Sequence, residues 1–426
     1  MEKYEKNITE GVTFAALKTD KSKYDMITVN FLFPRNEETT AFSALLSAVI
    51  DRGTVNYPDM RSLEIAQEEL YAASAEVYTR AMGECMCLTF SASYMNKAYT
   101  MEKEDLTSPM LALLGELMFN PLTVDGGFLP QYVESEKKNQ IDIIRSRKDN
   151  KSTYAVRRCV ELMCENEAYA IPADGNEETV SRINGKNLYE FHKRIISQCP
   201  VHIVFSGNAD GEDIYNKLCE NISFTPRASS IPQNVIIQKA DKIKLFTEEM
   251  NISQSKLSIG CRTGIEEGRD QWLAFSVFKE IFAISPTSKL FMNVREKLSL
   301  CYYCSMVSQY IKGMFVISAG INACDKDKAY NAIMNELTAM KNGDFTDEEF
   351  DTAIRNIKSS FRGVTDSIRS INNFYFARYI EGKDISPRKA AEMLDTVTRE
   401  DVIRCANNIT VDTVYFLKGG NGEDDN

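Results

Sequence analysis

The stretch Thr396–Gly420, TVTREDVIRCANNITVDTVYFLKGG, begins as a helix and ends as a strand. Thr398 is a good helix N-cap, because its hydroxyl can accept a free N–H of the first turn, and acidic residues follow it. The later run TVYFL is rich in β-branched and aromatic residues, and two glycines follow it. The sequence therefore predicts a helix followed by a buried strand near the end of the chain.

The same order of elements occurs about half a chain earlier. Residues 180–188, VSRINGKNL, form a turn that enters a helix, and residues 203–208, IVFSGN, follow as a buried strand. The opening strands also correspond, with MITVNFLF at 26–33 and KLSIGC at 256–261. A unit of about 200 residues that occurs twice explains this order. We therefore predict an α+β chain of two homologous tandem domains.

A Pro- and Ser-bearing stretch, FTPRASSIP at 224–232, resembles a linker between the two domains. We predict a first domain at residues 1–222, a linker at 223–244 and a second domain at 245–426.

The composition limits the classes of function. Of the 426 residues, 43% are hydrophobic and 26% are charged, as in ordinary soluble globular proteins. The net charge of −11 argues against a nucleic-acid surface. No apolar run reaches the roughly 18 residues that cross a bilayer, and the N-terminus lacks the apolar core of a signal peptide. Eleven scattered cysteines suggest reduced thiols and a cytoplasmic location.

The chain contains only two histidines, His192 and His202. A zinc hydrolase normally uses at least two histidine ligands, or cysteines at chelating spacing in their place. His192 lies in a helical pattern and His202 in a strand-like run, and their spacing does not make them a pair. We expect both histidines to be structural.

Two segments carry a resemblance to a known family. Residues 288–302, SKLFMNVREKLSLCY, resemble the second-domain signature of the insulinase, pitrilysin and mitochondrial processing peptidase family, which reads roughly S-R-L-F-x-x-V-R-E-K-x-G-L-x-Y. Residues 169–192 resemble the P-Y…G-x-E…I…L…F-H run of the same family. The resemblance extends over nearly the whole chain. It implies two homologous α+β domains that form half of a clam-shell chamber.

The resemblance also locates the family's zinc motif, H-x-x-E-H, in which two histidines bind zinc and the glutamate activates water. The corresponding residues here are Ala44, Ser47 and Ala48, and the later glutamate ligand falls at about Ile143. None of these side chains can bind zinc or deprotonate a water. The resemblance therefore implies a chain that is catalytically silent by itself and has no metal or cofactor of its own.

Two polar positions of the second-domain signature are kept, as Arg295 and Tyr302. In the family this arginine can anchor a substrate carbonyl or carboxylate, and the tyrosine can donate to the developing oxyanion. The resemblance implies the same substrate-binding roles here. The alternatives are a salt bridge within a charged helix for Arg295 and a half-buried strand aromatic for Tyr302. The glycine-rich loop that usually precedes the signature is replaced by Ala283–Thr287.

The family also binds substrate as an added strand at the edge of the first-domain sheet. The corresponding segment is residues 73–78, so Ala75, Glu76 and Val77 are further candidates for substrate binding. The alternative is an ordinary edge or hairpin strand.

Three functions follow from these observations. The first is a non-catalytic subunit that binds a peptide or unfolded protein, pairs with a homologous zinc-bearing peptidase subunit, and contacts neither nucleic acid nor membrane. The second is a scaffold protein without proteolytic output, as in small bacterial motif-less members associated with elongation factor P modification. The third is a thiol oxidoreductase that uses Cys301 and Cys304, although residues three apart on a strand point to opposite faces and could not pair.

Overall fold

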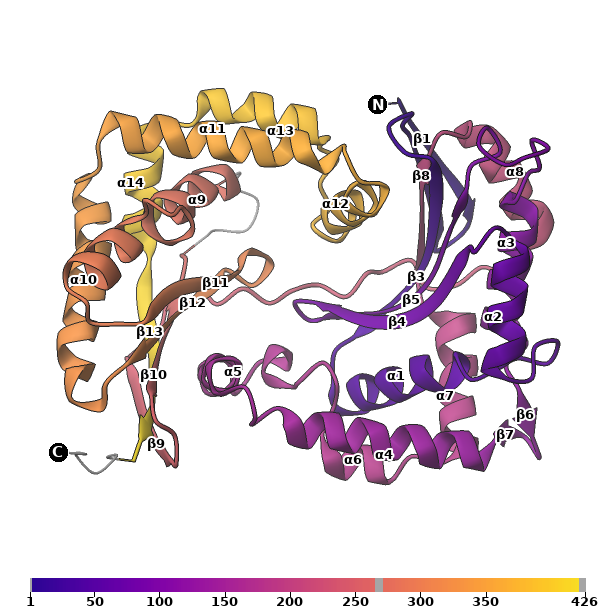
Figure 1. Cartoon of the computed structure of the whole chain (residues 1–426), viewed down its shortest axis with the longest axis horizontal. Coiled ribbons are helices and arrows are strands. Elements are labelled where there is room, and N and C mark those ends of the chain that lie inside the picture. The colour runs from indigo at the N-terminus through magenta and orange to yellow at the C-terminus, as the bar shows by residue number, and fades with distance from the viewer. Residues whose placement is uncertain (1, 265–270, 421–426) are drawn as a thin grey trace. The chain divides into compact units, whose positions relative to one another are not determined.

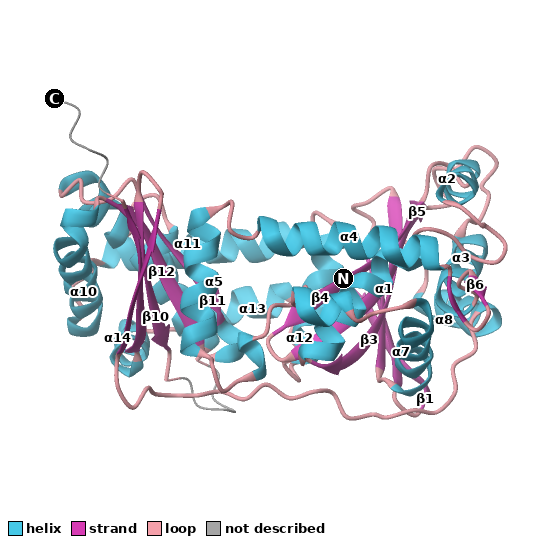
Figure 2. Ribbon diagram, turned by 90° about the horizontal axis from the view of Figure 1, so that it is seen from below, coloured by secondary structure: helices cyan, strands magenta, loops and turns pink. Residues whose placement is uncertain are grey.

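The computed structural model describes residues 2–264 and 271–420. The chain divides into two compact units, and each unit is assembled from three stretches of sequence. Unit 1 comprises Met1–Arg145, Ile171–Gln233 and Gly363–Pro387, and unit 2 comprises Ser146–Ala170, Asn234–Arg362 and Arg388–Asn426. Each unit is a β-sheet with covering helices (Figures 1 and 2), which confirms the α+β prediction. The domain boundaries expected from the sequence stay a prediction.

The sheet of unit 1 has six strands in the order β1-β2-β8-β3-β5-β4. All neighbours are antiparallel except β2 and β8, which are parallel. A separate pair, β6 and β7, completes the strands of this unit. The bounds are β1 Glu2–Thr9, β2 Val12–Lys18, β3 Tyr24–Pro34, β4 Ser74–Met82, β5 Cys85–Met95, β6 Thr123–Val124, β7 Gly127–Phe128 and β8 Val201–Gly207.

One face of this sheet forms the main core. Alternate residues of β3, such as Ile27, Val29 and Phe31, are buried in it, because successive strand residues point to opposite faces. Helix α1 (Glu37–Ile50) begins at Asn36, whose side chain caps the first turn, and it contributes Leu45 to the same core. The other helices of the first part of the chain are α2 Met60–Glu69, α3 Thr107–Phe119, α4 Pro130–Ser146, α6 Glu177–Ser181, α7 Gly185–Gln198 and α8 Gly211–Asn221.

The opposite face of the unit 1 sheet carries both polar and apolar side chains and is covered by α12 (Ile368–Ile380), a helix from late in the sequence, which packs on Leu17 and Val204. The Thr28 hydroxyl donates to the Asn372 side chain at 3.0 Å, and the His202 ring stacks on Tyr379 with ring centres 3.5 Å apart. Helix α12 therefore completes unit 1, although it follows most of unit 2 in the sequence.

The sheet of unit 2 has five strands in the order β11-β12-β10-β13-β9. Helix α5 (Lys151–Met163), from the first half of the sequence, packs on it through Cys159 and Met163. The remaining elements are β9 Lys244–Met250, β10 Ser255–Arg262, α9 Trp272–Lys279, η2 Glu280–Ile284, η3 Leu290–Lys297, β11 Tyr303–Gln309, β12 Met314–Ile321, α10 Lys326–Asn342, α11 Asp347–Val364, α13 Pro387–Met393, α14 Arg399–Asn408 and β13 Thr410–Gly419, with short 3₁₀ turns η1 Ala168–Ala170, η4 Tyr310–Lys312, η5 Ala323–Asp325 and η6 Leu394–Thr396.

The opening stretch has the structure that its sequence predicts. Thr398 caps α14 by accepting from the Asp401 N–H, and β13 is buried over most of its length. Strands at 26–33 and 256–261 lie within β3 and β10, as expected. In residues 2–264 and 271–420, no helix combines the length and the apolar character that crossing a bilayer requires.

Candidate functional site

The segment that carries Arg295 is a π-helix, η3, between Leu290 and Lys297. Leu290 and Val294 are fully buried, and Ser288 just before them is also buried. These positions of the signature therefore anchor the segment to unit 2. A π-helix is rare and is frequently found at functional sites.

Arg295 is partly exposed, with 41% of its side chain accessible. Its guanidinium lies 4.6 Å from the centre of the Phe291 ring and forms an ion pair of 3.5 Å with Glu296. The alternative considered for Arg295, a salt bridge within a charged helix, is therefore present in the structure. Both of its partners are exposed, so it contributes at most about 1 kcal/mol and can exchange for a ligand.

Tyr302 lies immediately before β11 and is 65% exposed, so it is not the half-buried strand aromatic that we considered. Its backbone N–H donates to the Gly320 carbonyl at 2.9 Å, which fixes the main chain and leaves the phenol free to move. Between Arg295 and Tyr302, Ser299 adopts a left-handed backbone with φ of 51°. Such backbone strain in a non-glycine residue is found disproportionately at functional sites.

The positions of the altered zinc motif lie on α1, in unit 1. The Ser47 hydroxyl donates to the Ala44 carbonyl at 3.0 Å, so it is used within the helix, and Ala48 offers no polar atom. Ile143 on α4 is 54% exposed. Residues 2–264 and 271–420 contain no group of three or more His, Cys, Asp or Glu side chains able to hold a metal ion. These side chains do not fit the zinc ion of the family motif.

The acidic residue Asp51 closely follows the positions that the resemblance aligns with the zinc motif, and no local pattern indicated its role. Burial raises the pKa of Asp51 to about 7, and the nearby Glu76 and Glu136 add to this effect, while a hydrogen bond from the Val77 N–H opposes it. The next residue, Arg52, forms an ion pair of 3.4 Å with Glu136. At the end of α1, Asp51 therefore interacts with β4 through the Val77 N–H, and Arg52 interacts with α4 through Glu136.

The candidates Ala75, Glu76 and Val77 lie on β4, which is an edge strand of the unit 1 sheet. Val77 points into the core, whereas Glu76 is exposed and lies 3.9 Å from Arg369 of α12.

Both histidines are in structural positions. His192 is buried, its Nε2 lies 2.9 Å from the Met118 carbonyl oxygen, and burial lowers its pKa to about 4. Burial likewise lowers the pKa of His202 to about 3. Both rings are therefore neutral near pH 7.

The two cysteines of the C-x-x-C are not arranged as the sequence suggested. Strand β11 begins only at Tyr303, so the rule that places residues three apart on opposite faces does not apply to Cys301. The two thiols are buried and hydrogen-bond to each other. That bond, followed by the charge of Arg295, lowers the pKa of Cys301, and the same bond raises the pKa of Cys304. The expectation that the two side chains diverge was wrong.

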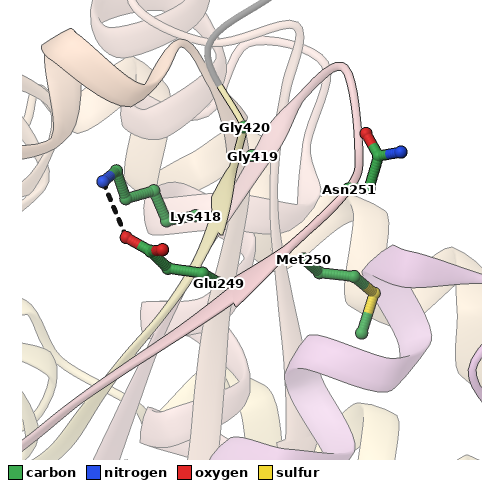
Figure 3. A pocket seen from close by; sticks show the side chains of 6 residues that line it. All are labelled: Glu249, Met250, Asn251, Lys418, Gly419 and Gly420. Carbon is green, nitrogen blue, oxygen red and sulfur yellow. Dashed lines mark hydrogen bonds and ion pairs between the residues drawn. The ribbon is translucent and has the colours of Figure 1, made fainter.

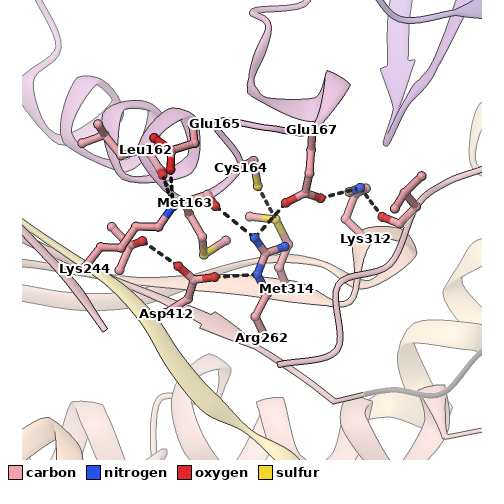
Figure 4. Close-up of polar contacts among 12 residues, drawn as sticks. Leu162, Met163, Cys164, Glu165, Glu167, Lys244, Arg262, Lys312, Met314 and Asp412 are labelled. Carbon is pink, nitrogen blue, oxygen red and sulfur yellow. Dashed lines mark hydrogen bonds and ion pairs between the residues drawn. The ribbon is translucent and has the colours of Figure 1, made fainter. Parts of the chain in front are cut away.

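A buried ionic cluster in unit 2 was not predicted from the sequence (Figure 4). Arg262 bonds to Glu167 at 2.7 Å and to Asp412 at 2.8 Å, and Lys312 bonds to Glu167 at 2.8 Å. None of these four side chains is more than 6% exposed. The cluster joins the segment after α5 to β10, β13 and the start of β12, so its role is to complete unit 2. Nothing in the local sequence pairs these residues.

Two surface pockets in unit 2 lie outside the predicted substrate-binding residues. One, of about 470 Å³, lies where β9 and β13 end, beside an ion pair of 2.8 Å between Lys418 and Glu249 (Figure 3). The other, of about 360 Å³, lies between α11 and the loop that replaces the glycine-rich segment, and Ser285, Thr287 and Ser288 line it.

Comparison with known proteins finds relatives among M16 peptidases. The model of the peptidase M16 inactive domain matches residues 182–357, a range that includes Arg295 and Tyr302. A protein of Bacillus subtilis named probable inactive metalloprotease YmfF is 29% identical over 97% of both chains. These similarities to M16 proteins bear out the family resemblance expected from the sequence.

Solved structures with the same fold are known at low sequence identity. A conserved protein from Enterococcus faecalis V583 superposes with a TM-score of 0.91 at 24% identity, covering 99% of this chain and all of that one. The periplasmic protease PqqL from Escherichia coli superposes with a TM-score of 0.72 at 12% identity. That match covers 99% of this chain and 48% of PqqL, so this chain corresponds to about half of that protein.

Proposed function

We propose that this chain is a non-catalytic M16 subunit that binds an extended peptide or an unfolded protein segment. A homologous subunit with an intact zinc motif would carry out hydrolysis. The observation that carries the proposal is the contrast between the two units. Unit 1 has Ala44, Ser47 and Ala48 where the family binds zinc. Unit 2 keeps Arg295 exposed on an anchored π-helix and Tyr302 exposed just before β11.

The chemistry of the two retained side chains suits substrate positioning. The guanidinium of Arg295 can hold a peptide carbonyl or a terminal carboxylate with two parallel N–H donors. The phenol of Tyr302 can donate to an oxygen on which negative charge develops. Neither role requires a metal ion in this chain.

The test uses the full chain with and without a zinc-bearing M16 partner co-purified from the native cell. We expect the purified chain to contain no stoichiometric zinc and to cleave no peptide, and we expect the partner to restore cleavage. Arg295→Ala and Tyr302→Phe should each lower the rate of the complex by at least about tenfold. Matched exposed controls, Arg388→Ala on α13 and Tyr99→Phe, should leave it unchanged.

Wild-type rates for both Arg295→Ala and Tyr302→Phe would remove the assigned roles. Zinc-dependent cleavage by the isolated chain would contradict the proposal as a whole.

A scaffold function without proteolysis is the second candidate, because the relative that matches along 97% of the chain is itself named probable inactive metalloprotease. This function would include the link to elongation factor P modification. It predicts a stable complex with a partner, no cleavage in that complex, and no effect of Tyr302→Phe on complex formation.

A further inference from the structure

Strand β4 is an edge strand, and two of its outward backbone donors, at Ala75 and Val77, are already engaged. In an antiparallel pair, residues two apart along a strand direct their N–H groups the same way. The Ala75 N–H donates at 2.8 Å to the side-chain oxygen of Gln67, a residue of α2 outside the sheet. The Val77 N–H, two residues on, donates to the Asp51 carboxylate. These two groups would otherwise be free to pair with a further strand.

The residue Gln67 connects α2 to this edge at two atoms, and a third atom bonds within α2. Its backbone carbonyl accepts the Ala73 N–H at 3.0 Å, its side-chain oxygen accepts the Ala75 N–H, and its Nε2 donates to the Leu63 carbonyl at 3.2 Å. The side-chain amide is therefore oriented from within its own helix. Gln67 therefore accepts the N–H groups of both Ala73 and Ala75, which are consecutive donors on the outward side at the start of β4.

The helix that supplies Gln67 is only lightly attached to unit 1. Leu63 is the single buried residue of α2, and Met60 and Ile65 are exposed. A short helix with one buried side chain gains little from burial of apolar surface. Its hydrogen bonds to β4 are therefore a large share of what holds it in place.

The connection from α2 to β4 is strained. Tyr71 and Ala72, which are consecutive, both have left-handed backbones with φ of 61° and 53°. Non-glycine residues avoid this region, because the Cβ atom crowds the backbone, and two in succession are unusual. Movement of α2 away from β4 would release this strain.

We propose that α2, Gln67 and Asp51 form an edge latch that closes β4 against an added peptide strand. In the closed form the donors of Ala75 and Val77 are used internally, so an extended peptide gains no main-chain hydrogen bonds from them. When α2 moves away, the strain at Tyr71 and Ala72 is relieved, the Ala75 N–H is freed, and the edge accepts an extended polypeptide at this residue, while Asp51 still holds the Val77 N–H. The latch lies within unit 1 and does not depend on the roles proposed for Arg295 and Tyr302.

The test measures strand binding and amide protection on the full chain. The probe is a fluorescein-labelled peptide of alternating threonine and valine, which favours the extended conformation, and binding is followed by fluorescence anisotropy. Gln67→Ala should bind the probe at least about tenfold more tightly than wild type, and its Ala75 amide should exchange with deuterium about tenfold faster.

Three variants serve as controls. Gln67→Glu keeps an oxygen acceptor for the Ala75 N–H and should remain closed. Gln131→Ala removes an exposed glutamine from α4 and should behave as wild type. In the Gln67→Ala background, Ala75→Pro removes the freed donor and should abolish the gain in binding.

Three results would overturn the latch. The first is unchanged probe binding in Gln67→Ala despite faster exchange of the Ala75 amide. The second is equal exchange of that amide in wild type and Gln67→Ala. The third is a gain in binding that survives Ala75→Pro.

A further variant, Ala72→Gly, leaves Gln67 and Asp51 in place and relieves strain in the closed form. It should slow exchange of the Ala75 amide several-fold, and faster exchange would equally contradict the proposal.

Discussion

Asp51 is a buried carboxyl group beside the edge strand of the unit 1 sheet. Its carboxylate lies at the end of the helix that carries the altered zinc positions, and it accepts a hydrogen bond from the edge strand. Glu76 on β4 and Glu136 on α4 face it with negative charge, and Arg52 is paired with Glu136. Burial and these neighbours raise the pKa of Asp51 to about 7. The folded chain therefore retains a proton that the unfolded chain releases near pH 4.

We expect the contribution of Asp51 to stability to fall as pH rises from about 4 to about 7. The pKa is higher in the folded state, so the folded chain binds more protons across this window and loses stability as they dissociate. Asp51→Asn removes the titration and keeps an oxygen for the Val77 N–H. At pH 8 the variant should be more stable than wild type by about 1–3 kcal/mol, with little difference near pH 4.

Urea denaturation at several pH values, followed by circular dichroism, measures this effect. Asp125→Asn, at a turn between β6 and β7, is a suitable control for the loss of one charge. Parallel pH profiles for Asp51→Asn and wild type would contradict the assignment.

At the scale of elements, α5 and the turn after it are secured to unit 2 by buried charge. Burial alone would raise the pKa of Glu167, but hydrogen bonds from Arg262 and Lys312 outweigh it and lower that pKa. Glu167 is thus ionised between two buried cations. Buried ion pairs add little over apolar packing, but removal of one partner leaves the others without compensation.

We therefore expect Glu167→Ala to lower the free energy of unfolding by about 3–5 kcal/mol. The loss arises because Arg262 and Lys312 stay buried after their shared carboxylate is removed. The matched control is Glu165→Ala, which removes an exposed partner of Lys244 at 2.8 Å and should cost less than about 1 kcal/mol. Urea titration of both variants gives the comparison, and equal stabilities would show that the cluster does not hold this segment.

At the scale of the whole molecule, each unit contains a covering helix that lies in the sequence among the residues of the other unit. Helix α5 precedes the linker but packs on the sheet of unit 2, and α12 follows most of unit 2 but packs on the sheet of unit 1. A cut in the linker therefore separates each sheet from one of its covering helices.

We expect separately produced fragments 1–233 and 234–426 to unfold without a cooperative transition. Fragment 1–233 lacks α12, which leaves the sheet face that carries Thr28 and His202 uncovered, and fragment 234–426 lacks α5. Mixing the fragments should restore a cooperative thermal transition, measured by circular dichroism and calorimetry. Cooperative unfolding of either fragment alone would show that its sheet does not need the exchanged helix.

The parts of the fold that the sequence predicts correctly are set by neighbouring residues. Thr398 and the run that follows it carry a cap and a strand pattern, so α14 and β13 could be located. The motif around Arg295 carried the resemblance to the family, whereas the correspondence of Ala44, Ser47 and Ala48 to its zinc motif stays a prediction.

The rest depends on contacts between residues far apart in the sequence. Arg262 meets Glu167 and Asp412 only after the sheet has formed, and no local pattern pairs them. The π-helical turn at Arg295 and the left-handed Ser299 depend on packing around buried Leu290 and Val294. The use of Gln67 to cover an edge strand likewise follows from the placement of α2 rather than from its sequence.

The position of α12 also has a consequence for biosynthesis. Strand β8, on which α12 packs, is complete at Gly207, whereas α12 ends at Ile380. At ordinary translation rates the ribosome needs roughly ten to thirty seconds to make the intervening chain. During that interval the sheet face that carries Thr28 and His202 lacks its covering helix. Unit 1 can therefore complete its fold only after most of unit 2 has been synthesised.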